Sequence, residues 1–344
     1  MNSVKKIRTK QGNLNLIEVS LPNIKASFLD YGATIYDIKT KDKNGEFESI
    51  VLKYQDINDY FNNNIFLNST VGPLSGRTKD GLFYIDDKKF QLDLNDGKVD
   101  LHSGKDSLAS KYFDFEIIED EKSIKVIFTH IANYDSAFPG VQVFKTIYTI
   151  SETSLLIEFL GETDTTTAMN LTNHVYFNLS GDMKSRVLDS TLKVNSSRAL
   201  KTDEDFVPCA VFDSTNSHLD FRKTKRIKDS FFEGIYDTPA FGIDDQFLVD
   251  EVNFDISQAT LTDEVSNRTL DVYTTYPVIV IYTHNHISNQ MLFDGLHTQH
   301  MGICFETQYE SNGINIPEFN NSILRKDEKY YHKTLYKFGL KKSM

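Results

Sequence analysis

Alternation of apolar and polar residues with a period of two recurs along the chain and constrains its fold more than any other feature. Clear examples are SIKVIFTH from Ser123, VFKTIYTI from Val143, SLLIEFL from Ser154, RTLDVYTT from Arg268 and VIVIYTHN from Val278. Successive residues of a β-strand point to opposite faces, and pleated surfaces favour the Val, Ile, Thr, Phe and Tyr of these segments. Pro277 interrupts the last stretch, which therefore predicts two strands. No long helical periodicity competes, so we expect an all-β, mostly antiparallel protein.

The domain organisation follows from length and punctuation. A chain of 344 residues could form two domains of ordinary size, but a large β-sandwich can take up as many residues alone. Turn dipeptides such as Asn44-Gly45 and Asp96-Gly97 occur, whereas no Pro/Ser-rich linker, low-complexity block or internal repeat divides the chain. We therefore expect residues 1–344 to form a single domain.

Charge and hydropathy limit the possible partners. The formal net charge is −12 and no long run of Lys or Arg occurs, which argues against nucleic acid or an anionic membrane as a partner. The start, MNSVKKIRTKQGNLNL, lacks the apolar stretch of a signal peptide, and no stretch of about 18 apolar residues occurs. We expect a soluble, cytoplasmic protein with a small-molecule partner. Its two cysteines, Cys209 and Cys304, are expected to be thiols, because a chain of this size needs no disulfide scaffold.

One ten-residue segment, NLTNHVYFNL, has an unusual polar face if it forms a strand. One parity is mainly apolar, and the other consists of Asn170, Thr172, His174, Tyr176 and Asn178. Exposed strand faces usually carry Lys, Glu and Thr, whereas uncharged hydrogen-bonding groups around an imidazole suit a cavity for a neutral polar ligand such as a sugar. A core strand with a satisfied histidine would show the same pattern, so both interpretations stay open at this point.

A second segment, GICFETQ, places a carboxylate in an otherwise apolar strand. Cys304, Glu306 and Gln308 share one parity with Gly302. A buried acid is costly unless it is paired or used, which makes Glu306 a candidate for chemistry. The alternative is a glutamate on a solvent face or in a salt bridge.

Three further positions are weak candidates when taken singly. Arg77 follows Gly76 in VGPLSGRTKDG and could fork two donors onto a hydroxyl or carboxylate oxygen. His102 precedes a small Ser-Gly pair that would let a ligand approach closely. Asp244 and Asp245 are adjacent, so only one of them can face a given site if the segment is extended.

Two other chemistries have little support. The pairs His284/His286 and His297/His300 could contribute to a metal site, but neither has a nearby Cys or an HExxH context, so no metal is expected. The segment PLSGR lacks the first glycine of a GxSxG nucleophile elbow.

Taken in order, the motifs resemble those of one family, the aldose 1-epimerases, also called galactose mutarotases. The segment DYGATIYDIKTKDKNGEFESIVLKYQD resembles the opening of that family. The other matching motifs are GxxxGR ending at Arg77, LHxG at 101–104, FPG at 138–140, HxYFNL at 174–179, DFR at 220–222, GxD at 242–244, YTxN at 282–285 and ETQ at 306–308. Each motif is short, but their shared order along nearly the whole chain makes chance a poor explanation.

The resemblance implies a large antiparallel β-sandwich of the galactose mutarotase-like supersandwich type, with an open cleft. The family's catalytic base falls on Glu306 and its catalytic acid on His174. Substrate contacts fall on Arg77, His102 and Asp244, with Gln308 as a neighbour. This chain departs from the family at Ser103, at Asp245, at His284 and at Pro208-Cys209-Ala210. These departures bear on substrate preference more than on the reaction.

The implied reaction interconverts the α and β anomers of free aldohexoses such as galactose and glucose. It needs one base for the anomeric hydroxyl and one acid for the ring oxygen, and no cofactor. We expect Glu306 or Asp244 to lie close enough to His174 to favour a charged imidazole. The preferred sugar stays open among galactose, glucose, a pentose, maltose and a phosphorylated sugar, as does the choice of monomer or homodimer. Alternatives are a hexose-phosphate or disaccharide mutarotase, a glycosidase and a non-catalytic carbohydrate-binding relative.

Overall fold

The computed structural model describes residues 2–134, 137–231, 241–287, 290–292, 298–320 and 322–341. Antiparallel β-sheets dominate these residues, which confirms the predicted all-β fold. The helices are short 3-10 turns: η1 (Ile57–Asn62), η2 (Gly104–Asp106), η3 (Leu108–Ser110), η4 (Val187–Asp189), η5 (Ile227–Ser230) and η8 (Gly313–Asn315). In the described part of the chain, no helix is long and apolar enough to cross a membrane.

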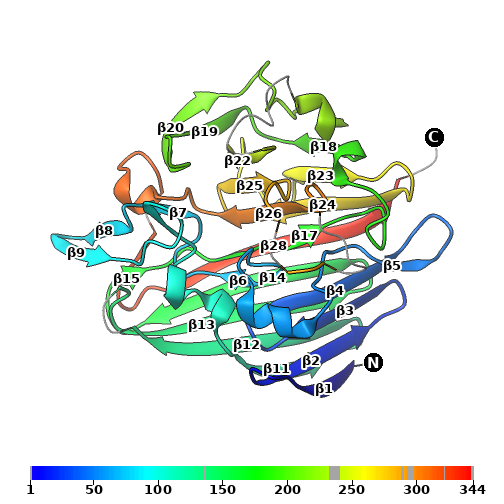
Figure 1. The fold of residues 1–344 in the computed structure, drawn as a ribbon, viewed down its shortest axis with the longest axis horizontal. Coiled ribbons are helices and arrows are strands. Elements are labelled where there is room, and N and C mark those ends of the chain that lie inside the picture. Colours follow the sequence, from blue (N-terminus) through cyan, green and yellow to red (C-terminus); the bar gives the residue numbers. More distant parts are fainter. Residues whose placement is uncertain are drawn as a thin grey trace.

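The largest sheet has nine strands, and early and late segments of the chain meet in it. Its order is β11 (Asp114–Glu119), β12 (Ser123–Asn133), β13 (Val141–Ser151), β14 (Ser154–Thr163), β28 (Tyr330–Leu340), β24 (Arg268–Thr274), β23 (Ala259–Thr262), β18 (Thr191–Val194) and β21 (Lys225–Arg226). Figure 1 shows β28, in red, running through the middle of the molecule. It pairs with β14 on one side and with β24 on the other.

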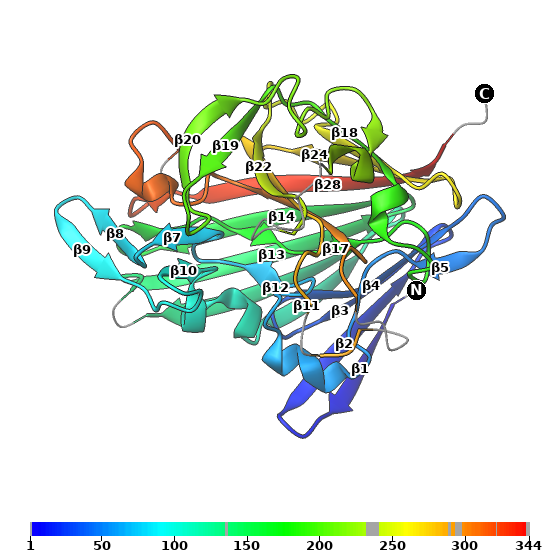
Figure 2. The ribbon, with the colours of Figure 1, turned by 45° about the horizontal axis from the view of Figure 1, so that its top comes forward.

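Two further large sheets and several two-stranded sheets make up the rest of the described β-structure. One contains β17 (Tyr176–Phe177), β26 (Ile303–Gln308), β25 (Val278–Tyr282), β22 (Asp244–Leu248), β19 (Arg198–Thr202) and β20 (Pro208–Asp213). The other contains β1 (Asn2–Arg8), β2 (Asn13–Ser20), β3 (Ile24–Leu29), β4 (Thr34–Lys41) and β5 (Phe47–Ser49). The two-stranded sheets are β6 (Thr70–Val71) with β16 (Thr172–Asn173), β7 (Arg77–Lys79) with β10 (Val99–Leu101), β8 (Leu82–Ile85) with β9 (Lys88–Gln91) and β15 (Thr167–Ala168) with β27 (Ile323–Leu324). The β8–β9 hairpin projects from one end of the molecule (Figure 2).

Apolar side chains of the three large sheets pack into one continuous core. Phe28 of β3 stacks on Tyr148 of the nine-stranded sheet, with ring centroids 4.7 Å apart. Phe177 of β17 meets Tyr336 of β28 edge-on at 4.9 Å. The five- and six-stranded sheets are therefore anchored to the nine-stranded sheet through aromatic contacts, as in a sandwich.

The segment NLTNHVYFNL does not form one strand, and this corrects the prediction of a single continuous strand. It forms β16 and then β17, because β16 pairs with β6 whereas β17 pairs with β26. The backbone between them is held by another loop: the N–H of His174 donates to the carbonyl of Ser69, and the N–H of Asn68 donates to the carbonyl of His174. The alternation nonetheless continues across this break, because Leu171, Val175, Phe177 and Leu179 all belong to the hydrophobic core.

Candidate active site

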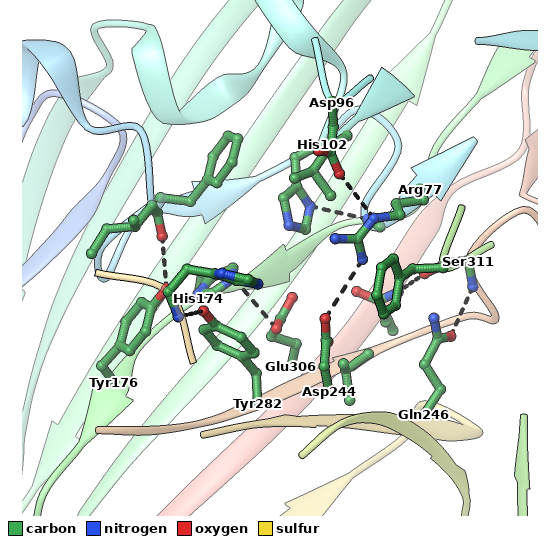
Figure 3. Close-up of a pocket in the computed structure, with 18 of the residues that line it drawn as sticks. Arg77, Asp96, His102, His174, Tyr176, Asp244, Gln246, Tyr282, Glu306 and Ser311 are labelled. Atoms are coloured by element: carbon green, nitrogen blue, oxygen red, sulfur yellow. Dashed lines mark hydrogen bonds and ion pairs between the residues drawn. The ribbon is translucent and has the colours of Figure 1, made fainter. Parts of the chain in front are cut away.

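A cavity of about 310 Å³ lies against the six-stranded sheet. Residues of β17, β22, β25 and β26 form one side of it, and residues around β7 and β10 form the other. Five of the predicted side chains converge on this space (Figure 3): Arg77, His102, His174, Asp244 and Glu306. Gln308 also lines it, so the structure brings all six predicted site residues together.

Glu306 reaches the cavity from the middle of β26, as the alternation of that strand predicts. Gln308 points to the same side, whereas Phe305 belongs to the hydrophobic core. Glu306 is 4 % exposed, which removes the alternative of a solvent-facing glutamate. A carboxylate in this position is available for chemistry but costly to ionise.

His174 lies between β16 and β17 with both ring nitrogens facing side chains of β26. Its Nε2 is 3.4 Å from Oε1 of Glu306, and its Nδ1 is 3.4 Å from Sγ of Cys304. The ring stacks on Tyr176, with centroids 5.0 Å apart, and meets His102 edge-on at 5.4 Å. The imidazole is therefore held against the carboxylate by packing on more than one side.

Only part of the predicted polar face of NLTNHVYFNL serves the cavity. His174 and Tyr176 line it. Asn178 instead donates to the backbone carbonyls of Ser185 and Met301, and Asn170 exchanges hydrogen bonds with the backbone of Tyr309. The two asparagines are structural, because buried amides must satisfy their hydrogen-bonding groups.

Residues around the two-stranded sheet of β7 and β10 form the opposite wall of the cavity. The backbone N–H of His102 donates to the carbonyl of Gly76, and the N–H of Gly76 donates to Nδ1 of His102. Since Nδ1 accepts, the proton of a neutral His102 lies on Nε2, which makes this side chain a hydrogen-bond donor. Gly76 has φ +78°, and a Cβ there would collide with Ser311, so the loop requires glycine.

Arg77 begins β7 and is fixed by two carboxylates and an aromatic ring. Its Nε donates to Oδ2 of Asp96 at 3.0 Å, and its Nη1 is 3.7 Å from Oδ2 of Asp244. The guanidinium lies over the ring of Phe206, 5.4 Å from the centroid. Asp96 and Phe206 escaped the sequence analysis: the Asp96-Gly97 dipeptide showed a turn, but not that this turn would place a carboxylate beside Arg77.

Asp244 and Asp245 point to opposite sides of β22, as expected for an extended segment. Asp244 lines the cavity, whereas Asp245 shares the parity of the core residues Ile243 and Phe247. Burial and the neighbouring Asp244 raise the pKa of Asp245 to about 7. The departure from the family at this position therefore does not change the cavity wall directly.

The departures at Ser103 and His284 also have local explanations. Ser103 has φ +67°, where glycine is the usual residue, and its hydroxyl bonds with the backbone of Leu74. His284, at φ +50°, is buried against Tyr176 and does not line the cavity. Position 284 thus has the backbone conformation for which the family's glycine is suited.

The clustered histidines near residue 290 do not assemble a metal site in the described part of the chain. His286 lines the cavity, His300 contacts the carbonyl of Thr283, and His297 lies outside the described residues. The ligand-type atoms that do come together, within 4.8 Å of one another, belong to His102, His174 and Glu306.

Burial dominates the electrostatics of the acid–base pair. Burial, with a further contribution from Asp244, raises the pKa of Glu306 to about 8, although Arg77 opposes the shift. Burial lowers the pKa of His174 to about 4 and that of His102 well below its ordinary value. The expectation that a nearby carboxylate would favour a charged His174 is therefore wrong: the carboxylate is close, but loss of hydration outweighs its attraction. Near pH 7 the pair of Glu306 and His174 shares one ionisable proton.

Comparison with known proteins identifies relatives along nearly the full length. The family model described as aldose 1-epimerase matches residues 15–337. Galactose mutarotase from Mus musculus is 25 % identical over 332 residues, which cover 96 % of this chain and 95 % of that protein. Aldose 1-epimerase from Haemophilus influenzae is 29 % identical over 321 residues, 92 % of each chain. The crystal structure of an aldose epimerase homologue from C. elegans superposes with a TM-score of 0.86 at 25 % identity, covering 95 % of this chain and 99 % of that one.

Proposed function

The chain belongs to the aldose 1-epimerase family of carbohydrate isomerases, and we propose that it interconverts the α and β anomers of free aldohexoses such as galactose and glucose. The observation that carries this proposal is the buried pair of Glu306 and His174, 3.4 Å apart at the wall of a cavity. A base and an acid at one site are what ring opening requires.

The proposed reaction conserves the single proton of the pair. The Glu306 carboxylate takes the proton of the anomeric hydroxyl while the His174 imidazolium gives its Nε2 proton to the ring oxygen. The bond between the anomeric carbon and the ring oxygen breaks, which leaves an open-chain aldehyde, a protonated Glu306 and a neutral His174. After rotation about the bond next to the aldehyde carbon, the reverse transfers close the ring on its other face and restore the pair.

Sugar binding prepares the pair for the forward step. Without a ligand, burial favours the proton on Glu306, as the pKa directions of both residues indicate. A sugar hydroxyl that donates to Glu306 stabilises the carboxylate, because hydrogen bonds to a charged form favour that form. The proton then resides on His174, next to the ring oxygen.

The remaining wall residues supply orientation. Arg77 and the Nε2–H of His102 are donors for sugar oxygens, and Asp244 is an acceptor for sugar hydroxyls. Donors directed at an oxygen that gains negative charge also lower the barrier to ring opening. Gln308 lies beside them as a further hydrogen-bonding group.

The charge of the cavity favours a neutral sugar over a hexose phosphate. Among the residues that line the cavity in the described part of the chain, Arg77 is the only Lys or Arg. That guanidinium already faces Asp96 and Asp244. A phosphate would bring two negative charges towards the carboxyl groups of Asp96, Asp244 and Glu306, which is unfavourable at short range.

Polarimetry tests the proposal directly. Freshly dissolved α-glucose and α-galactose lose optical rotation slowly on their own, and we expect the protein to accelerate this change in proportion to its concentration. Heat-denatured protein is the control. Failure to accelerate the mutarotation of any free aldose would refute the proposal.

We also propose that residues 1–344 form one domain that acts in the cytoplasm as a monomer or homodimer. The continuous hydrophobic core supports the single domain. The two cysteines, which are both free thiols, are compatible with a reducing compartment. Size-exclusion chromatography with light scattering would distinguish monomer from dimer.

A further inference from the structure

Cys304 occupies the position directly behind the proposed acid. It lies two residues before Glu306 on the same face of β26, and its side chain is fully buried. Its Sγ is 3.4 Å from Nδ1 of His174, while Glu306 faces Nε2 at the same distance. The two ring nitrogens of His174 thus contact two side chains of the same strand: Nδ1 contacts Cys304 and Nε2 contacts Glu306.

Packing determines where the ring of His174 lies but not where its proton lies. Tyr176 stacks on the ring, and Phe66 and His102 pack against it at centroid distances of 6.2 and 5.4 Å. A neutral imidazole carries one N–H, and the hydrogen-bond partner of each nitrogen decides which nitrogen bears it. The sulfur of Cys304 makes a hydrogen-bonding contact with Nδ1.

We propose that Cys304 is a positioning residue whose sulfur accepts a hydrogen bond from Nδ1–H of His174, so that Nε2 is the nitrogen that gives and takes back the proton at the sugar ring oxygen. The inference rests on the proposed mutarotase function. In the ring-closed state both nitrogens of the imidazolium carry protons. In the ring-open state the proton on Nδ1 remains and Nε2 is free to receive a proton from the substrate.

A thiol suits this task because it is uncharged and a weak acceptor. A carboxylate behind the imidazole would fix the same tautomer but would also stabilise the imidazolium and make it a weaker acid. Burial raises the pKa of the Cys304 thiol well above its ordinary value, and Glu306 and Asp244 add to this, so the group stays neutral. His174 therefore keeps a low proton affinity, which favours transfer to a weakly basic ether oxygen.

In the competing arrangement the thiol of Cys304 is the hydrogen-bond donor and Nδ1 of His174 is the acceptor. If the thiol S–H donates to Nδ1, the neutral imidazole carries its proton on Nε2 and cannot accept one from the ring-open sugar. The two arrangements predict different tautomers of the same residue, and this difference is measurable.

The first experiment is ¹⁵N NMR of the full chain with labelled histidine at pH 7, with His174 assigned by comparison with His174→Asn. We expect the signature of a protonated Nδ1 and an unprotonated Nε2. A protonated Nε2 with an unprotonated Nδ1 would overturn the inference. This measurement does not depend on turnover, so it stays informative even if no sugar is found to be a substrate.

The second experiment separates hydrogen bonding from packing. Cys304→Ser keeps an acceptor, Cys304→Val fills the space without one, and Cys304→Ala does neither. Loss of one hydrogen bond to the imidazole is expected to lower kcat about tenfold in the Val and Ala variants with KM little changed, whereas Ser stays within about threefold of the parent. Cys209→Ala is the matched control, because Cys209 is the exposed cysteine on β20.

The outcomes are distinct. If Cys304→Val keeps the turnover of the parent and Cys304→Ser does not, the side chain acts by filling space and the inference is wrong. Equal turnover in all four Cys304 forms would also contradict it. If Cys304→Ala fails to fold, the comparison of Ser with Val and the tautomer measurement still decide. If the parent protein accelerates no mutarotation, the proposed function is wrong. The NMR measurement then still tests whether Cys304 accepts a hydrogen bond from Nδ1–H of His174.

Discussion

Replacing Glu306 by Gln is expected to stabilise the folded chain increasingly as the pH rises. Burial and Asp244 raise the pKa of this carboxyl from 4.5 to about 8. Between these values the folded protein holds a proton that the unfolded chain has released, so the stability of the parent falls as pH rises through this window. Each tenfold change in proton affinity corresponds to about 1.4 kcal/mol, which gives about 5 kcal/mol over the full window. Glutamine is neutral throughout and does not incur this loss.

In the parent, titration of His174 changes the stability with pH in the opposite direction to Glu306. This contribution is the same in both proteins and cancels when they are compared. The pKa of His174 is lowered from 6.5 to about 4, so its contribution to stability rises with pH between those values. Because both proteins contain His174, the difference between them isolates position 306. We expect near-equal stability at pH 5 and an advantage for Glu306→Gln that approaches about 5 kcal/mol at pH 9.

Urea denaturation followed by far-UV circular dichroism at pH 5, 7 and 9 measures this difference. Asp220→Asn supplies a control of opposite sign. Arg222 holds the pKa of Asp220 below its ordinary value, so that substitution should destabilise the protein at pH 7 and above. The reasoning is refuted if the stabilities of Glu306→Gln and the parent keep a constant difference across the three pH values, or if Gln is the less stable form at pH 9.

Three further outcomes are expected from the site. Glu306→Gln and His174→Asn should each lower turnover by about 10²-fold or more while circular dichroism stays unchanged, and near-full activity in either contradicts the assignment. The profile of kcat/KM should be bell-shaped, falling below about pH 4 as the pair gains a second proton and above about pH 8 as it loses the last one, whereas a rate that stays level up to pH 10 would argue against this pair. Gly76→Ala should lower the midpoint of thermal unfolding and raise KM, because its Cβ would collide with Ser311 at φ +78°; unchanged values of both would show that the loop adapts.

Much of the strand content could be predicted because alternation is a local property. The segment from Ser123 became β12, that from Ser154 became β14, and the stretch broken by Pro277 became β24 and β25. The pairing of these strands was not predictable in the same way. The positions of β28 between β14 and β24, and of β17 beside β26, depend on contacts between residues distant in sequence.

The candidate site was predicted by combining parity with motif order. Parity directed Glu306 and Gln308 to one side of β26, and motif order added Arg77 and His102, whose spatial closeness no local pattern shows. The break between β16 and β17 was not predicted, because a change of strand partner leaves no mark on composition. The protonation of His174 was mispredicted for a related reason, since the depth of burial is set by tertiary packing.

The central placement of β28 has a consequence for synthesis on the ribosome. Until residues 330–340 have been translated, the edge of β14 that receives them lacks its partner, so the nascent chain carries an unpaired, aggregation-prone strand edge from residue 163 to residue 330 of its elongation. Long-range closure of a sheet is also slow compared with local hairpin formation. Productive folding of the nine-stranded sheet is therefore a late event that depends on β28, and slowing translation between β14 and β28 would prolong exposure of that edge rather than help the sheet to form.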